Sequence, residues 1–150
     1  MRIAFVNFDI DKYLFKFAEK ISQKYSVVSF MGYRKPKLNS ILKNYDFLDA
    51  THLYHVDNFK KQYDEKLLIK NKENYLKYFL IFSKIMDRVS PKLHSSNYKE
   101  LYFWKLINFF SNYISEKKID VLFFDCTPHR PWDFILFLVA KNLEKKNIDI

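Results

Sequence analysis

Ile3-Ala4-Phe5-Val6 is a continuous apolar run near the start of the 150-residue chain. Such a run is typical of a β-strand that is covered on both faces. From Ile10 to Tyr25 apolar residues recur at helical spacing, while lysines repeat every four residues on another face of the segment. Val27-Val28-Ser29-Phe30-Met31 is a second apolar run. Strand, helix and strand in this order are the unit from which parallel sheets are built.

A second strand-and-helix unit stands near the other end of the chain. Ile119-Asp120-Val121-Leu122-Phe123-Phe124-Asp125 predicts a buried strand, and the turn that follows leads to Pro131, which suits the first position of a helix. We expect that helix to end at about Lys146 and Asn147–Ile150 to begin another strand. The elements predict an α/β fold with a Rossmann-like parallel sheet, in the order 3-2-1-4-5, flanked by helices.

The middle of the chain is expected to be mainly helical. His52-Leu53-Tyr54-His55-Val56 predicts a weak third strand, and Ser40–Tyr45 predicts a short helix. Two long helical patterns cover about residues 74–89 and 98–117, and both are apolar almost all the way round. A helix of that kind has to be covered on several sides. We therefore expect this segment to pack against another domain, a second copy of the chain or a membrane surface.

The chain is expected to be one domain of a larger protein. A domain rarely ends where a strand begins, and a strand pattern begins at Asn147. We expect residues 1–150 to form a single Rossmann-like domain, the N-terminal half of a longer two-domain protein.

The net charge of +9 is concentrated in the middle of the chain. Residues 58–118 hold 13 Lys and Arg against 6 Asp and Glu, a balance of +7, and they are rich in aromatic residues. Basic surface attracts nucleic acid, anionic lipid or anionic glycan. The plainer interpretation is a solvated lysine-rich face. The sequence has no RNP, helix-turn-helix or zinc-finger pattern, so specific nucleic-acid binding is not expected.

Simple counts exclude several classes of site and location. The single glycine, Gly32, excludes a P-loop and a GxGxxG fingerprint, which need several residues without a Cβ. The single cysteine, Cys126, excludes a disulfide framework and fits the reducing cytoplasm. The longest uncharged stretch, Leu106–Ser115, is far shorter than the roughly 18–20 residues of a membrane helix. We expect a cytoplasmic protein, soluble or peripheral at the inner membrane face.

The strand order predicts where a ligand binds. Ligands of doubly wound sheets bind where the strand order reverses, outside the carboxyl ends of the strands. The two sides of that place are Asn7-Phe8-Asp9 and Asp125–Arg130. His129 is the first candidate for a catalytic base, because imidazole accepts protons near neutral pH and Asp125 would orient it. Asp125 and Asp9 are the other two catalytic candidates.

Other residues at the same place are candidates for binding. Asn7, Thr127 and Arg130 are expected to contact an acceptor or an anion, since a guanidinium pairs well with phosphate or carboxylate. The structural alternatives are a solvated Arg130 and a His129 that only helps to cap the following helix. Asp133 is expected to stabilise the start of that helix, and Cys126 to be an inert thiol.

A metal site is not expected. His52, His55 and Asp57 resemble a ligand cluster, but positions 52 and 55 of a strand point to opposite faces. The set also lacks a residue that would complete the coordination.

Several of these motifs resemble the N-terminal domains of GT-B-fold glycosyltransferases of the family 4 type. The similar segments are Leu14–Ile21 with Tyr25–Phe30, then Ile119–Asp125 with Pro128-His129, and the apolar helix Phe134–Leu143. The loop after the first strand differs from the family, which often has glycines where this chain has Asn7-Phe8-Asp9-Ile10-Asp11.

The resemblance implies an acceptor-side domain of an enzyme of surface polysaccharide or glycolipid synthesis. The acceptor would be a glycan or a lipid-linked glycan, and His129 or Asp9 would lie near the reacting hydroxyl. No cofactor is expected in this half, because a missing C-terminal domain would bind most of the nucleotide-sugar donor.

Two alternatives stay open. The first is a non-catalytic module that binds anionic lipid, glycan or nucleic acid through residues 58–118. The second is a flavodoxin-like receiver or a small-ligand sensor, which the sequence favours least because it lacks a convincing acidic cluster with a downstream Lys. A homo-oligomer is compatible with each of these functions.

Overall fold

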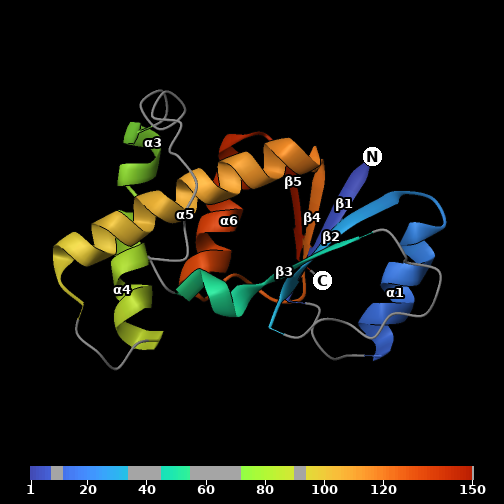
Figure 1. Cartoon of the computed structure of the whole chain (residues 1–150), viewed down its shortest axis with the longest axis horizontal. Helices are drawn as coiled ribbons and strands as arrows, with labels where there is room; N and C mark the ends of the chain where they lie inside the picture. The colour runs from blue at the N-terminus through green and yellow to red at the C-terminus, as the bar shows by residue number, and fades with distance from the viewer. Residues whose placement is uncertain (8–11, 34–44, 55–71, 90–93, 150) are drawn as a thin grey trace.

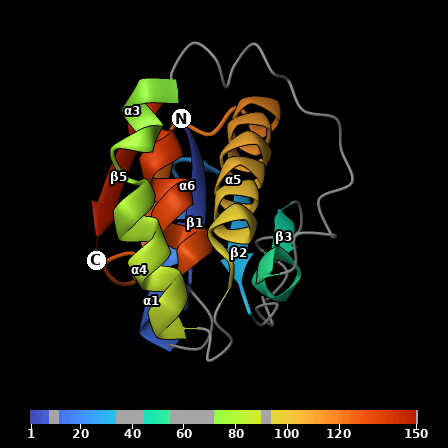
Figure 2. The ribbon, with the colours of Figure 1, turned by 90° about the vertical axis from the view of Figure 1, so that its left-hand side faces the viewer.

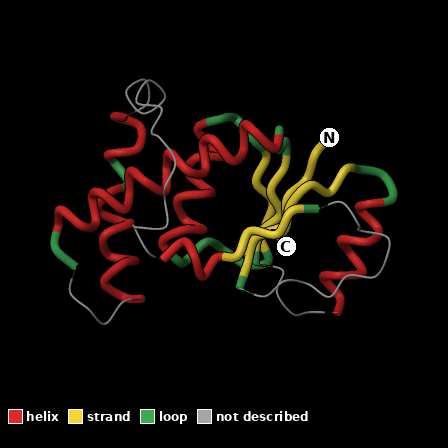
Figure 3. Tube along the Cα trace, in the orientation of Figure 1, coloured by secondary structure: helices red, strands yellow, loops and turns green. Residues whose placement is uncertain are grey.

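A parallel sheet forms the centre of the computed structural model, which describes residues 1–7, 12–33, 45–54, 72–89 and 94–149. Its strands are β1 (Arg2–Val6), β2 (Ser26–Gly32), β3 (Asp46–Asp49), β4 (Val121–Phe124) and β5 (Lys146–Asp149). They lie in the order β3-β2-β1-β4-β5, and each neighbouring pair is parallel. The α/β fold, with helices on both sides of the strands (Figure 3), is confirmed, and so is the strand order.

Helices cover both faces of this sheet (Figure 1). The helix α1 (Lys12–Ser22) lies on one face, and α5 (Ser96–Lys117) and α6 (Pro131–Asn142) lie on the other. Two further helices, α3 (Lys72–Leu76) and α4 (Phe79–Val89), lie outside α6, and α4 contacts both α5 and α6 (Figure 2). The long helical segment expected before the fourth strand is therefore present.

The alternation of side chains along β1 explains why its sequence is apolar without a break. Ile3 and Phe5 belong to the core on the α1 side, whereas Ala4 and Val6 belong to the larger core on the α5 and α6 side. All four side chains are fully buried. The apolar residues of α5 are covered mostly by the chain itself, since Phe103, Leu106, Phe110 and others belong to that larger core.

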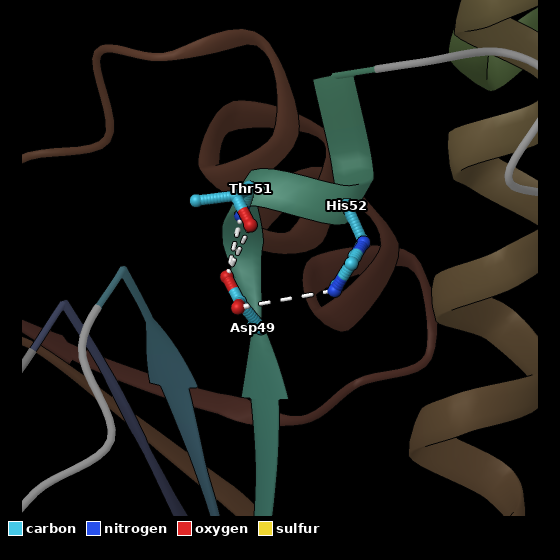
Figure 4. Close-up of polar contacts among 3 residues, drawn as sticks. All are labelled: Asp49, Thr51 and His52. Atoms are coloured by element: carbon cyan, nitrogen blue, oxygen red, sulfur yellow. Dashed lines mark hydrogen bonds and ion pairs between the residues drawn. The ribbon is translucent and has the colours of Figure 1, made fainter.

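The third strand lies earlier than the sequence suggested. β3 spans Asp46–Asp49, and residues Ala50–Tyr54 form the 3₁₀ helix η2 instead of a strand at His52–Val56. The Asp49 carboxylate accepts hydrogen bonds from the Thr51 backbone N–H (2.9 Å) and hydroxyl (2.7 Å), which turns the chain directly after the strand (Figure 4). The Nε2 atom of His52 lies 3.9 Å from the same carboxylate. The part of the expected strand after Tyr54, and residues 40–44 of the helix expected at Ser40–Tyr45, lie outside the described residues.

The helix expected at about 74–89 is two helices. The Tyr78 backbone N–H donates to the Tyr75 carbonyl at 2.9 Å, so this hydrogen bond spans three residues, whereas those of an α-helix span four. A new helix, α4, then begins at Phe79. Neither Gly nor Pro marks this position, so periodicity alone could not show the break. Within the described residues, no helix is long and apolar enough to cross a membrane.

The last helix also ends earlier than expected. α6 ends at Asn142, and Glu144 takes a left-handed backbone with φ 56°. That conformation lets the Lys145 N–H reach the Ala140 carbonyl at 2.8 Å, as helix ends with a left-handed residue commonly do. The strand expected at Asn147–Ile150 is present as β5.

Candidate functional site

Asn7 lies directly after β1, at the point between β1 and β4 where the strand order reverses. Its backbone is left-handed, with φ 65°, and its N–H donates to the Met31 carbonyl at 2.7 Å. Asparagine is one of the few residues other than glycine that adopt this conformation readily. Asn7 thus makes the turn directly after β1, and it adds a buried amide side chain.

Arg130 reaches the same place from the turn after β4. Its Nη1 donates to Asn7 Oδ1 at 3.1 Å. Its guanidinium carbon lies 4.4 Å from the centre of the Tyr33 ring, within the range of a cation–π contact. Asn7 and Arg130, which were expected to act together, are brought into direct contact.

Asp133 supports both of these residues from the first turn of α6. Its Oδ1 accepts the Arg130 backbone N–H at 2.7 Å, and its Oδ2 accepts a hydrogen bond from Asn7 Nδ2 at 3.2 Å. The carboxyl is fully buried. Burial raises the pKa of Asp133 above its ordinary value, although the hydrogen bonds from Arg130 and Asn7 act in the opposite direction. Asp133 stabilises the helix start, as expected, and also holds Asn7.

The Tyr33 ring that contacts Arg130 is held by two other aromatic residues. The Trp132 indole N–H donates to the Tyr33 hydroxyl at 2.9 Å, and that hydroxyl lies 2.5 Å from the hydroxyl of Tyr54. Burial is the main cause that raises the pKa of Tyr54, and its hydrogen bond with Tyr33 adds to the shift. We call the six residues of this site the switch-point network: Asn7, Tyr33, Tyr54, Arg130, Trp132 and Asp133.

The catalytic candidates after β4 lie beside this network. His129 is exposed, and its Nδ1 lies 3.1 Å from the Thr127 carbonyl oxygen and 3.7 Å from Cys126 Sγ. Burial and a hydrogen bond with Asp125 raise the pKa of Cys126 to about 12, which fits the expected inert thiol. The orientation of His129 by Asp125 stays a prediction, as does a ligand contact of the exposed Thr127.

Other expected or neighbouring groups complete the surroundings. Arg88, near the end of α4, donates from Nη2 to the His129 carbonyl at 2.7 Å and so fixes the turn. Asp9 lies outside the described residues, as do His55 and Asp57. Among the described residues, no group of three or more potential ligands could hold a metal ion.

The sequence pattern does not predict that Tyr33, Tyr54 and Trp132 belong to this site. Tyr33 directly follows Gly32 at the carboxyl end of β2, and this position was the one available signal. Tyr54 lies in η2, in a segment that was expected to be a strand.

No family model, curated protein or solved structure matches the chain. The chemistry of the switch-point network is therefore judged from its own residues. Arg130 is a fixed cation at the carboxyl ends of β1 and β4. Among the described residues, its guanidinium donates a hydrogen bond to Asn7 alone. Since a guanidinium carries five N–H donors, this arrangement can bind an oxyanion.

Proposed function

We propose that the chain is the acceptor-binding domain of a glycosyltransferase and that it holds an anionic, hydroxyl-bearing acceptor at the switch-point network. The observation that carries the proposal is the position of Arg130, whose guanidinium is bonded to Asn7 and stacked on Tyr33 where the strand order reverses. Ligands of doubly wound sheets bind at that place.

The charge of Arg130 supports an anionic group on the ligand. The nearest carboxylate in the network, that of Asp133, accepts the Arg130 backbone N–H and the Asn7 amide, and it forms no ion pair with the guanidinium. Among the described residues the Arg130 guanidinium thus has no carboxylate partner, and a guanidinium in that state favours phosphate or carboxylate, which it binds through parallel hydrogen bonds. A sugar phosphate or a lipid-linked sugar phosphate carries such a group next to hydroxyls.

The chemical step assigned to this half is activation of the acceptor hydroxyl. His129 lies in the same turn as Arg130 and is exposed, so a bound acceptor can reach its ring. Asp9 and Asp125 remain the carboxylate candidates for this role. The nucleotide-sugar donor belongs to the expected second domain.

Chemical-shift mapping of the chain with glucose 1-phosphate tests the binding part of the proposal. We expect the largest shifts at Asn7, Tyr33 and the Arg130 side chain, and smaller shifts with uncharged glucose, because the guanidinium would then lack its anion. Shifts that gather on α3 and α4 instead would contradict the proposal. Transfer of labelled sugar by the protein that carries this domain, compared with its His129→Asn variant, tests the chemical role.

A second candidate function is supported by one feature of α4. Leu80 is 72% exposed and Ile81 is 48% exposed, and both lie on one helical face with the exposed Lys84. Exposed apolar side chains beside lysines fit the surface of an anionic membrane. We infer that this face would bind vesicles that contain phosphatidylglycerol and not vesicles of phosphatidylcholine alone. Equal binding to both, or to neither, would contradict this function.

A further inference from the structure

Both the oxygen and the nitrogen of the Asn7 side-chain amide form hydrogen bonds. Its Oδ1 accepts from Arg130 Nη1 at 3.1 Å, and its Nδ2 donates to Asp133 Oδ2 at 3.2 Å. Asn7 is 5% exposed and Asp133 is fully buried, so water has little access to this pair of bonds. The amide is thus a bridge between a buried carboxylate and the guanidinium at the binding site.

The chemistry of the two neighbours decides which way the amide faces. A guanidinium only donates hydrogen bonds, and an ionised carboxylate only accepts them. The Asn7 oxygen therefore has to face Arg130, and the nitrogen has to face Asp133. A reversed amide would set two donors against each other and leave two acceptors facing each other.

We propose that Asp133 is a positioning residue, which acts through Asn7 to hold the Arg130 guanidinium in the orientation that binds an oxyanion. This inference rests on the proposed function, because it concerns the same site. Asp133 controls Arg130 in two ways, through the backbone N–H at 2.7 Å and through the Asn7 amide. Loss of the carboxylate would free the guanidinium even though Asp133 does not bond to it.

Two single exchanges and their combination test this chain of bonds. Two donors, the Arg130 backbone N–H and Asn7 Nδ2, need acceptors at position 133. Asp133→Asn leaves only one acceptor oxygen there, so one of the two hydrogen bonds is lost. Asn7→Asp sets two carboxylates against each other. The double variant Asn7→Asp with Asp133→Asn again matches each donor with an acceptor, and aspartate tolerates the left-handed backbone at position 7.

The first measurement needs no ligand. Nuclear magnetic resonance of the Arg130 guanidinium should show two separate, slowly exchanging Nη signals in the wild type. We expect these signals to merge in Asp133→Asn and to separate again in the double variant. A matched control is Asp120→Asn, because Asp120 likewise accepts the backbone N–H of an arginine, Arg2, at 2.8 Å, but at the amino end of the sheet.

The second measurement is the affinity for glucose 1-phosphate. We expect Asp133→Asn to weaken binding by about tenfold, the effect of one charge-assisted hydrogen bond. The double variant should bind glucose 1-phosphate at least about threefold more tightly than Asp133→Asn does. Asp120→Asn should bind it as the wild type does. Partial recovery is expected because the carboxylate at position 7 would lie closer to the guanidinium.

The outcomes separate this inference from the proposed function. If Asp133→Asn leaves both Nη signals unchanged, or if the double variant behaves as the single variant does, Asp133 is not a positioning residue. If the Nη signals respond as expected and the wild type binds no sugar phosphate, the bridge exists but the proposed function is wrong. Thermal unfolding of each variant shows whether it folds, and the double variant is the test if Asp133→Asn does not.

Discussion

The guanidinium of Arg130 lies over the ring of Tyr33, with its carbon 4.4 Å from the ring centre. This contact joins the turn after β4 to the residue that follows β2, on either side of β1. Tyr33 is held in turn by Trp132 and Tyr54, so the cation rests on a fixed aromatic surface. The relationship makes the switch-point network a unit whose members can be tested separately.

Tyr33→Phe should destabilise the protein more than Tyr54→Phe does. Loss of the Tyr33 hydroxyl leaves the indole N–H of the fully buried Trp132 without its acceptor, and it also removes the bond to Tyr54. A buried donor without a partner costs about 1–3 kcal/mol. Tyr54→Phe removes a single bond and leaves Tyr33 paired with Trp132. Urea unfolding of the two variants measures the difference, and equal losses would show that the Trp132 bond contributes nothing.

Asn7→Gly and Asn7→Ala separate the backbone role of Asn7 from its side-chain role. Both remove the amide that bonds Arg130 and Asp133, so both should weaken sugar-phosphate binding alike. Only glycine keeps the left-handed backbone without strain, so Asn7→Ala should be the less stable by about 1 kcal/mol. Unfolding measurements and titrations give the two quantities. An unstrained Asn7→Ala would argue against the left-handed turn.

The raised pKa of Asp133 predicts how stability depends on pH. Because burial raises this pKa in the folded state, the protonated form is favoured on folding. Its contribution to stability is therefore fully present below the unfolded pKa, and it is lost as pH rises through the higher folded pKa.

A comparison with Asp133→Asn isolates this effect from the other carboxyl groups. The variant cannot titrate at this position, so the stability of the wild type relative to the variant should fall between about pH 4 and the folded pKa of Asp133. Thermal unfolding of both proteins across that range is the measurement. A relative stability that rises with pH would mean that the hydrogen bonds outweigh burial.

Cys126 should react slowly with alkylating reagents. Its pKa is raised to about 12 by burial and by Asp125, so the thiolate is scarce at neutral pH. Iodoacetamide should modify it about a hundredfold more slowly than an unstructured peptide thiol, or slower still. Asp125→Asn should speed the reaction, since it removes the negative charge beside the sulfur. A rate in the native protein equal to that of the peptide would contradict the assignment.

The sheet could be predicted from the sequence because its strands are continuous apolar runs. Ile3–Val6 and Val121–Phe124 are buried on both faces, so burial alone marks them. The position predicted for β3 is wrong because β3 is a short strand at the edge of the sheet with Asp at both ends. A local turn, in which the Asp49 carboxylate accepts hydrogen bonds from Thr51, ends this strand before the apolar residues that follow.

The site could be predicted in part, since its place follows from the strand order. Asn7 and Arg130 were expected there because they follow β1 and β4. The role of Tyr33 could not be seen, because an aromatic residue after a strand is usually part of the core. The bridge from Asp133 to Arg130 depends on the left-handed turn of Asn7, which the sequence does not mark.

The central claim is that Arg130 binds the anionic group of an acceptor. Calorimetric titration of the chain with glucose 1-phosphate tests it, with Arg130→Met compared with Arg2→Met. Arg2 bonds through Nε to the Lys117 carbonyl, at the opposite end of the sheet, and controls for the loss of one positive charge. We predict that Arg130→Met weakens binding by about tenfold or more and that Arg2→Met leaves it unchanged. Equal affinities of the two variants would contradict the account.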